Sequence, residues 1–554
     1  MCLKTKHSLL AVVLANSLAV SVYANTDAGL LNQELNQRQQ ERVKPSGSLF
    51  DNKVAVTGGK QANEAEFTLQ HIKVTDLDGN LVSEDLSHLL NNYVNKPTTL
   101  SELNLLVQKI TEYYRQNNYL VARAILPPQD IENGTLLINI IKGRIDNISV
   151  QNNSRLSTTI LNKISQANLK NNAYLYKSDL EKVALLLNDI QGVKPNLAIK
   201  AGQAKGSSDV VISVEDSKRF SGYLLLDNQG NKDTGQYRLS AGTQLNNLIG
   251  FGDDLKLDFL ISDKANLKSA RLDYSGLING YGTKLGVNAN YLDYKLGGNF
   301  KDLNAQGNSS TLGAYLLHPT IRTPEFRLNT KIAFNHQILK DEQNAVNVYQ
   351  KRKSNLINIS TNGSWRSTKN GITYFSLGTV FGKVNDHTND STQNQSKTTA
   401  FTVFQYQLTH EQALPKSFAL SLGISGQVAD TNLDSSQKML LGGLYAVRGY
   451  KSGVASVDNG HILQTELKHY LPLFKESILT TSLFYDYGKG EYYKNSQHLA
   501  PNVKNDVSIQ SAGIGLTLSA INNYAISATV AKTLGTKLAG NDKHQVWLSV
   551  AKTF

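Results

Sequence analysis

The sequence predicts a membrane all-β barrel of sixteen antiparallel strands, preceded by two small α+β domains and an N-terminal helix. From residue 219 onward, apolar and polar residues alternate with a period of two, as in strands that face lipid on one side and a lumen on the other. The links between these segments alternate between short and long. After residue 24, no run approaches the roughly 20 apolar residues that a membrane-spanning helix needs.

Residues 1–24 are predicted to be a signal peptide, because Lys4 and Lys6 precede a mostly apolar run over 9–22 and the chain then turns abruptly polar. The alternative, a buried first helix, fits the basic start less well. Cys2, the single cysteine of the chain, would leave with this peptide, so we expect neither a disulfide framework nor a cysteine-based zinc site. The whole chain has a net charge of +12, and losing two lysines lowers it to +10.

Residues 25–44 are predicted to contain a helix over 27–43, which Asp27 can cap and which is polar on nearly all sides. Its short apolar patch consists of Leu30, Leu31 and Leu35. A helix without a broad apolar face either protrudes into water or lies in a polar cavity. Residues 45–64, rich in Gly, Ser, Asn and Lys, are predicted to be a flexible linker.

Residues 65–143 and 144–217 are predicted to form two repeats of one α+β unit, each with the order strand, helix, helix, strand, strand. In the first repeat, Thr99 and Glu102 form a capping box that opens a helix. In the second repeat, Ser178 is predicted to cap a helix in the same way. The strands of the two repeats are predicted at 67–74, 119–126, 135–141, 145–150 and 210–214.

The barrel is predicted to occupy residues 218–554. Its sixteen strands are expected near 219–228, 235–245, 253–262, 268–279, 283–294, 310–320, 326–338, 353–366, 371–384, 398–413, 416–430, 458–471, 476–487, 508–521, 523–534 and 544–554. Short links lie at 322–325, 368–370, 414–415 and 522, whereas 295–309, 339–352, 385–397, 431–457 and 488–507 are long and polar. The alternative, a soluble propeller or tandem sandwiches, predicts neither this alternation of link lengths nor the strand that ends at Phe554.

No motif indicates an enzyme, a cofactor or a metal site. The chain has no Walker loop, no HExxH and no GxSxG, and its eleven histidines lack metal-ligand spacing. We therefore expect no catalytic residue. The positive charge fits a basic lumen or contact with anionic lipid head groups, and export of the chain argues against a nucleic-acid partner.

Several motifs resemble the TpsB family of two-partner secretion transporters, the haemolysin-activator (ShlB/FhaC/CdiB-like) branch of the POTRA-barrel superfamily. The segment 119–130, YLVARAILPPQD, is similar to their first POTRA domain, and the run LLLNDIQG over 185–192 is similar to their second. The matching POTRA positions are Arg123, Pro127, Gln129, Gly134, Gly143, Leu180, Glu181 and Gly192. Gln191 stands where many relatives have proline.

Two barrel motifs carry the same resemblance. Val447, Arg448, Gly449 and Tyr450 match the family's lid-loop signature after the eleventh strand, and Phe484 and Asp486 match its F-x-D motif in the thirteenth. The resemblance implies that the lid loop, residues 431–457, folds inward and that Arg448 meets Asp486. Without the family resemblance, we would expect Arg448 to be exposed and the Asp486 carboxylate to be solvated. Lys552 departs from the apolar face of the last strand, and we expect it to extend toward the interface.

The resemblance also implies a function. Such proteins lie in the bacterial outer membrane with their POTRA domains in the periplasm. They export a large β-helical exoprotein, such as a haemolysin, an adhesin or a contact-dependent inhibition toxin, whose N-terminal secretion domain the POTRA domains bind. The resemblance further implies insertion by the barrel-assembly machinery, a monomeric state, and a helix at 25–44 that plugs the lumen. A free periplasmic tether is the alternative for this helix.

Two other functions stay open at this point. A BamA-like assembly factor shares the barrel and the VRGY motif, but the POTRA motifs of this chain resemble those of such factors less. A passive porin explains the barrel but gives residues 65–217 no role.

Overall fold

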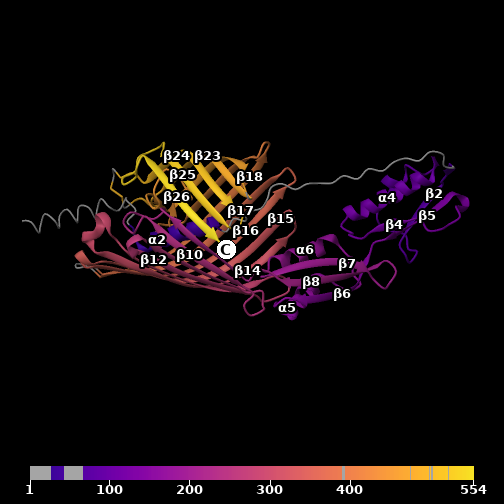
Figure 1. The fold of residues 1–554 in the computed structure, drawn as a ribbon, viewed down its shortest axis with the longest axis horizontal. Helices are drawn as coiled ribbons and strands as arrows, with labels where there is room; N and C mark the ends of the chain where they lie inside the picture. The colour runs from indigo at the N-terminus through magenta and orange to yellow at the C-terminus, as the bar shows by residue number, and fades with distance from the viewer. Residues whose placement is uncertain are drawn as a thin grey trace, which may run out of the picture.

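The computed structural model describes residues 26–42, 66–389, 394–474, 476–497, 499–500, 503–521 and 523–554. The predicted signal peptide, the linker at 45–64 and the link at residue 522 lie outside the described residues. Figure 1 shows a barrel with two α+β units extending in series from one end. None of the described helices is long and apolar enough to cross a membrane.

The first α+β unit has a three-stranded sheet in the order β2-β5-β4. Its elements are β1 (Phe67–Thr68), β2 (His71–Thr75), α3 (Ser87–Leu90), β3 (Pro97–Thr98), α4 (Leu100–Gln116), β4 (Arg123–Ile125), the short 3-10 helix η2 (Glu132–Gly134) and β5 (Thr135–Ile141). Both hydrogen bonds of the capping box between Thr99 and Glu102 are present, which confirms that prediction. The strand expected at 119–126 is shorter than predicted, because its first residues bond to the second unit instead of to β5.

The second unit has a sheet in the order β6-β8-β7. Its elements are β6 (Arg144–Asn153), α5 (Thr158–Asn168), α6 (Lys177–Asn188), β7 (Val193–Ala201) and β8 (Ser207–Asp216). The prediction that Ser178 caps α6 is wrong, because the helix already begins at Lys177 and Tyr176 is its N-cap residue. The Ser178 amide instead donates to Asn118 Oδ1 at 3.0 Å, so a residue of the first unit accepts a hydrogen bond from the N-terminal turn of this helix.

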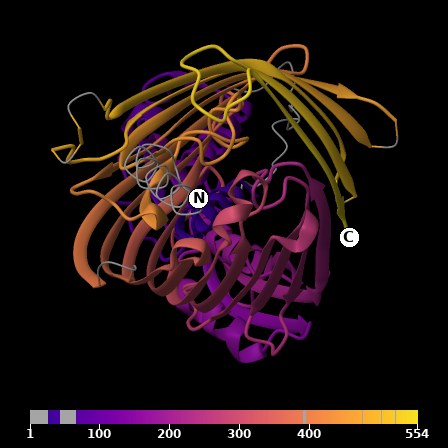
Figure 2. The same cartoon turned by 90° about the vertical axis from the view of Figure 1, so that its left-hand side faces the viewer.

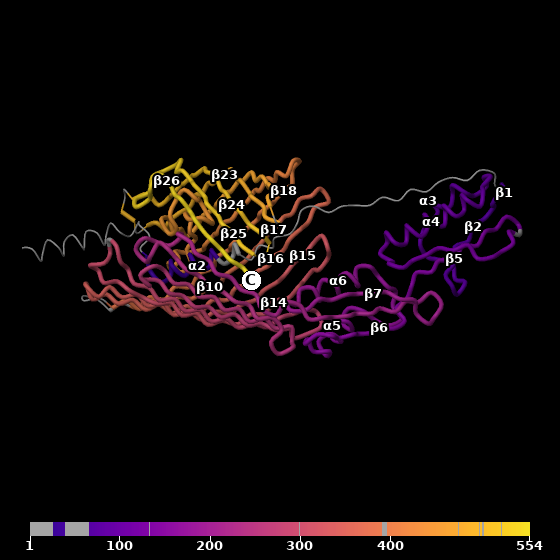
Figure 3. The backbone as a smooth tube through the Cα atoms, in the orientation of Figure 1, coloured from indigo at the N-terminus to yellow at the C-terminus, as the bar shows by residue number. Residues whose placement is uncertain are grey.

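The barrel is closed and has sixteen strands, as predicted. They are β9 (Phe220–Asp227), β10 (Arg238–Asn246), β11 (Asp254–Ser262), β12 (Leu267–Leu277), β13 (Lys284–Lys295), β14 (Ala305–Arg322), β15 (Phe326–Gln343), β16 (Val348–Ser367), β17 (Gly371–Asn389), β18 (Asn394–Leu414), β19 (Phe418–Ala429), β22 (Asn459–Pro472), β23 (Ser477–Glu491), β24 (Asp506–Ala520), β25 (Tyr524–Thr533) and β26 (His544–Thr553). Antiparallel pairing of β26 with β9 closes the cylinder, and Figure 3 traces the resulting path of the chain.

Alternation along each strand sorts the side chains between the two faces of the wall. On β16, for example, Ile357 and Ile359 are exposed on the outer surface, whereas Arg352 and Ser354 are buried on the lumen side. Strands β14 to β18 extend beyond the predicted ends, and β15 reaches Gln343 instead of residue 338. Their extensions are polar, so they pair as hairpins without the apolar alternation on which the prediction depended.

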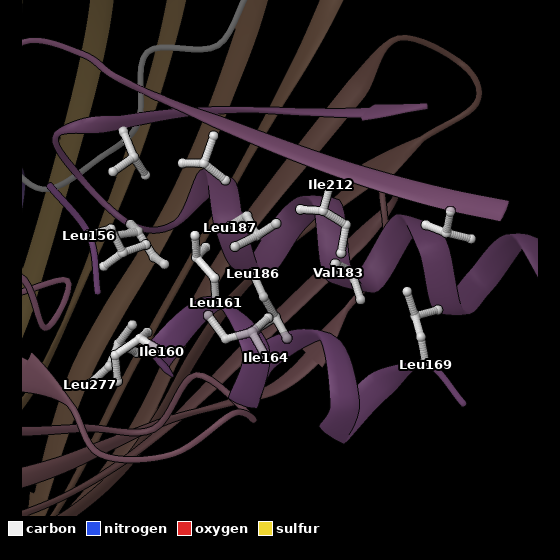
Figure 4. Close-up of a cluster of buried hydrophobic side chains, with 14 of the residues drawn as sticks. Leu156, Ile160, Leu161, Ile164, Leu169, Val183, Leu186, Leu187, Ile212 and Leu277 are labelled. Carbon is white, nitrogen blue, oxygen red and sulfur yellow. The ribbon is translucent and has the colours of Figure 1, made fainter. Parts of the chain in front are cut away.

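The second unit packs directly against the base of the barrel. Leu277 of β12 belongs to the buried cluster formed by α5, α6 and the sheet of this unit, and Figure 4 shows it beside Ile160. The Arg322 Nε atom lies 2.6 Å from Asp189 Oδ2 at the end of α6. The short links of the barrel therefore lie on the side of the α+β units, and the long loops lie at the opposite end.

Candidate functional site

Two segments among the described residues lie in the lumen and are not part of the wall. One is the helix α2 (Ala28–Arg42), and the other is the lid loop, residues 431–457, with its short strands β20 (Met439–Leu440) and β21 (Ser456–Val457) and the 3-10 helix η6 (Ser435–Gln437). Figure 2 looks into the barrel from the end opposite the α+β units and shows α2 inside it. The helix contacts η6, β20 and the wall strands β13, β14 and β15.

Arg448 of the lid loop meets Asp486 of β23 in a two-point contact. Its Nη2 atom donates to Asp486 Oδ1 at 2.8 Å, and its Nε atom donates to Oδ2 at 2.9 Å. The backbone amide of Arg448 also donates to Oδ2, at 3.0 Å. Asp486 is fully buried, so this charge-assisted contact is shielded from solvent.

Four further side chains complete the surroundings of Arg448. The Phe484 ring lies under the guanidinium, 3.4 Å from Cζ to the ring centroid. Glu466 of β22 accepts from Nη1 at 3.2 Å, and Ser511 donates to Asp486 at 3.2 Å. Trp547 Nε1 donates to the Arg448 carbonyl at 2.8 Å. The F-x-D motif pointed to Phe484, whereas no motif pointed to the other three.

The neighbouring motif residues let the lid loop lie close to the wall. A Cβ atom on Gly449 would lie 2.6 Å from the Ser511 Cβ, so a larger residue does not fit without a shift. Val447 and Tyr450 are fully buried in an apolar cluster of lid and wall residues. The Tyr450 hydroxyl donates to the Thr536 carbonyl at 2.8 Å.

The second half of α2 is held by buried ion pairs. Arg38 pairs with Asp227 of β9. Arg238 of β10 joins Glu34 of the helix at 2.8 Å and Asp227 at 2.9 Å. Two cations and two carboxylates thus neutralise one another where water is excluded.

The first turn of α2 is joined to both the wall and the lid loop by one cation. Arg352 of β16 pairs with Asp341 of β15, and its Nη1 atom lies 2.9 Å from Asp434 of the lid loop and 3.3 Å from Asp27. The Ser435 hydroxyl donates to Asp27 at 2.6 Å. Asp27 also caps α2, because its Oδ1 atom accepts from the Leu30 amide at 2.8 Å.

The surroundings of the apolar patch of α2 differ from the polar cavity that was expected. Leu31 is buried in a cluster with inward-facing apolar residues of the barrel, and Leu35 packs against the same cluster. Leu30 is also buried and lies against Gly453 of the lid loop. The cavity is therefore polar at both ends of the helix and apolar at these leucines.

The POTRA-motif positions do not form one site, and most of them shape local backbone. The Gln129 amide pairs with both backbone groups of Leu137, at 2.7 and 2.8 Å. Gly134, Gly143 and Gly192 all have positive φ. Of the remaining positions, Arg123 is the first residue of β4 and Pro127 follows that strand. Leu180 packs against the core of the second unit, and Glu181 pairs with Lys177 at 3.6 Å.

The junction between the two units is an aromatic cluster around a lysine. Lys142 Nζ lies 5.4 Å from the ring centroids of Tyr114 and Tyr119 and 2.5 Å from Glu84. Burial opposes the charged form of Glu84, but the hydrogen bonds from Lys142 and Tyr114 outweigh it and hold the pKa of this carboxyl below its usual value. Burial and the Tyr176 hydroxyl raise the pKa of Tyr119 to about 12.

The chain forms a closed sixteen-stranded barrel that holds a helix and an inward lid loop, and two α+β modules lie at its base. This arrangement defines a POTRA-bearing outer-membrane transporter. The model of the haemolysin secretion/activation protein family ShlB/FhaC/HecB matches residues 206–518, and that of the ShlB-type POTRA domain matches 67–143. The chain belongs to this family. It lies in the bacterial outer membrane with its POTRA domains in the periplasm, as the translocator of a two-partner secretion system.

Similar proteins agree with this assignment. The chain is 52% identical over 565 aligned positions to the heme/hemopexin transporter protein HuxB of Haemophilus influenzae strain 86-028NP, and the alignment covers 100% of both chains. It is 23% identical to the outer membrane transporter CdiB of Dickeya dadantii, over 72% of each chain. The solved structure of CdiB from Escherichia coli has the same fold, with a TM-score of 0.71 at 20% identity, covering 95% of this chain and 98% of that one.

Proposed function

We propose that this transporter exports an exoprotein that serves the acquisition of haem or haemopexin. The observation that carries the proposal is the 52% identity to HuxB, which extends over the POTRA domains as well as the barrel. The relative named outer membrane transporter CdiB is less than half as similar, at 23% identity. We therefore favour an exoprotein of haem or haemopexin acquisition, a cargo type that the family resemblance had not named.

The test is a secretion assay in a host that lacks such systems. This chain would be coexpressed with an exoprotein bearing the secretion domain of a haem- or haemopexin-binding partner, or with a contact-dependent inhibition toxin. We expect the first exoprotein in the culture supernatant and the second to stay in the periplasm. Equal export of both, or export of the toxin alone, contradicts the proposal.

Cargo capture is proposed to occur by strand addition in the periplasm. In the second POTRA sheet β7 pairs with β8 on one side, and no described strand pairs with its other edge, which offers backbone groups to an extended segment. A photocrosslinker at Asn196 of this edge is expected to trap the secretion domain, and one at the exposed Lys170 is not. Equal crosslinking at both positions contradicts edge capture.

The lumen contents support gated transport over a passive porin. Both α2 and the lid loop occupy the barrel, and buried ion pairs hold the helix there. We propose that α2 closes the pore at rest and that binding and folding of the exoprotein outside, without nucleotide hydrolysis or catalysis, give direction. A monomer inserted by the barrel-assembly machinery is the assembly that we propose.

Depletion separates this function from that of a general assembly factor. Loss of this chain is expected to remove one exoprotein from the medium and to leave the levels of other barrel proteins unchanged. A fall in many outer-membrane barrel proteins contradicts the dedicated role.

A further inference from the structure

Five basic side chains form a patch on the outer surface of the barrel wall. This outer basic patch consists of Lys340 of β15, Lys351 and Lys353 of β16, and Lys383 and His387 of β17. Lys340 and Lys351 are directly opposite each other in the sheet, and Lys351 is directly opposite His387. Side chains in such pairs start about 5 Å apart, and like charges placed there destabilise a sheet.

The alternation of the strands establishes that the patch faces away from the lumen. Arg352, between the two lysines of β16, is buried inside against Asp27 and Asp434, so its neighbours point outward. On β15 the residue before Lys340, Leu339, is fully buried, and on β17 Val384 is buried beside Lys383.

The patch lies where the wall leaves the hydrocarbon layer on the extracellular side. Further toward the periplasm on the same outer faces, Phe334, Ile357 and Phe381 are exposed apolar side chains. The strand β15 runs from the short link beside the POTRA domains toward the long loops, and Lys340 is near its far end. The basic side chains are therefore level with lipid head groups of the outer leaflet.

Within the described part of the chain, no carboxylate lies within 4.0 Å of these four ammonium groups. The acid on the same face, Glu342, accepts a hydrogen bond from Gln306 at 3.0 Å. By contrast, the outward Lys268 of β12 is directly opposite Asp293 of β13. The outer basic patch thus gathers like charges that the protein itself leaves unbalanced.

We propose that the outer basic patch binds the phosphate groups of a phosphorylated lipid in the outer leaflet. Adjacent cations above an apolar belt fit a ligand with phosphates on its head group and acyl chains below it. Each basic side chain near such a surface contributes about fivefold in affinity, so three lysines together contribute on the order of a hundredfold.

The test measures lipid binding by the purified full-length protein, using native mass spectrometry from detergent. The probe is a bisphosphorylated diglucosamine lipid, and its dephosphorylated form and inorganic phosphate alone are the comparison ligands. The variant K340Q/K351Q/K353Q is expected to lose on the order of a hundredfold in affinity for the probe. The charge-matched variant K268Q/K489Q/K532Q removes outward lysines elsewhere and is expected to bind within about threefold of the wild type.

Further results decide the proposal. The variant K351R/K353R keeps the charges and is expected to bind normally, and heat-modifiable electrophoretic mobility reports whether each barrel is folded. Equal losses in both triple variants, unchanged binding in the patch variant, or equal binding of the dephosphorylated lipid overturns the proposal. Binding of inorganic phosphate at the patch with the same affinity as the lipid also overturns the proposal.

Discussion

At the scale of single residues, the contact of Arg448 with Asp486 is the best defined feature of the lumen. Removing one partner of a buried pair leaves an uncompensated charge, which costs about 3–5 kcal/mol. We propose that this contact holds the lid loop, so that substitution of either partner loosens the loop rather than the wall.

We predict a graded response to substitution of Arg448. Arg448→Gln leaves the Asp486 carboxylate with only Ser511 and a backbone amide, so the lid loop becomes sensitive to protease and secretion falls sharply. Arg448→Lys keeps the charge but not the two-point geometry and is expected to be intermediate. Limited proteolysis and a secretion assay measure both effects.

A surface arginine is the matched control. Arg155 forms an exposed pair with Asp216 at 3.6 Å, and Arg155→Gln is expected to change neither readout. Normal secretion by Arg448→Gln, with the barrel folded, contradicts the proposed role of the pair.

A second residue-scale prediction concerns pH and Glu84. The pKa of this carboxyl is lower in the folded protein, so its stabilising contribution is present above its ordinary pKa and is lost as pH falls through the folded value. At neutral pH, the first POTRA domain of the wild-type protein should therefore be better protected from hydrogen exchange than the same domain of the Glu84→Gln variant. The difference should shrink below about pH 4.5. A difference that persists or grows on acidification contradicts this assignment.

Some residues of the site were predictable and others were not. The motifs VRGY and F-x-D pointed to Arg448 and Asp486, whereas Glu466, Ser511 and Trp547 come from three separate strands and have no local signature. The two capping predictions show the same limit. Thr99 exchanges hydrogen bonds with Glu102 of its own helix, whereas the Ser178 amide donates to Asn118, which is 60 residues earlier in the chain.

At the scale of elements, the period-two pattern was sufficient to predict all sixteen strands, because the lipid on one side of the wall and the lumen on the other impose opposite polarity. The composition of α2 was a weaker guide. Its leucines find apolar partners that come from distant strands, so no local pattern could indicate them.

Deletion of residues 25–44 should open the pore. The helix occupies the lumen, so its removal is expected to raise the single-channel conductance in planar bilayers, with the wild-type chain as the control. An unchanged conductance counts against the plug and favours a helix with another role.

A further element-scale prediction concerns the pairing of β9 with β26. The register of these strands has five residue pairs, from Asp227 opposite Ser549 to Tyr223 opposite Thr553, and Gly222 and Phe554 extend it with two mutual backbone hydrogen bonds at 3.0 Å. Above them the Asn228 side chain accepts from the Leu548 amide at 2.7 Å and donates to the Val546 carbonyl at 2.9 Å. Asn228→Ala removes both bonds and should cost about 2 kcal/mol.

The measurement is the temperature at which the purified barrel loses its heat-modifiable mobility. We expect this temperature to fall for Asn228→Ala and to stay the same for Asn308→Ala, an outward position in β14, which is paired on both sides. No difference between the two variants shows that the short pairing is sufficient without the Asn228 side chain.

At the scale of the whole molecule, the second POTRA domain is fixed to the barrel and the first is fixed to the second. The barrel contributes Leu277 to the core of the second domain, and the Lys142 cluster joins the two domains. The POTRA domains thus form one arm with a set direction.

Loosening the base of this arm should be measurable. Asp189→Lys places two cations together where Asp189 now pairs with Arg322, so the spread of distances between spin labels on the POTRA domains and the barrel should widen. Asp130→Lys, at a site remote from the barrel, is the control. An unchanged distribution shows that apolar packing alone sets the direction of the arm.

The arrangement around Arg352 links the position of the helix to that of the lid loop. Three carboxylates share this one guanidinium, so they also repel one another while the helix is in place. When Asp27 departs with its helix, Asp341 and Asp434 keep the cation with less competition, but the lid loop also loses the bond from Ser435 to Asp27 and the packing of Leu30 against Gly453. Departure of the helix is therefore expected to leave the lid loop held chiefly by Arg352 and by the contact of Arg448 with Asp486.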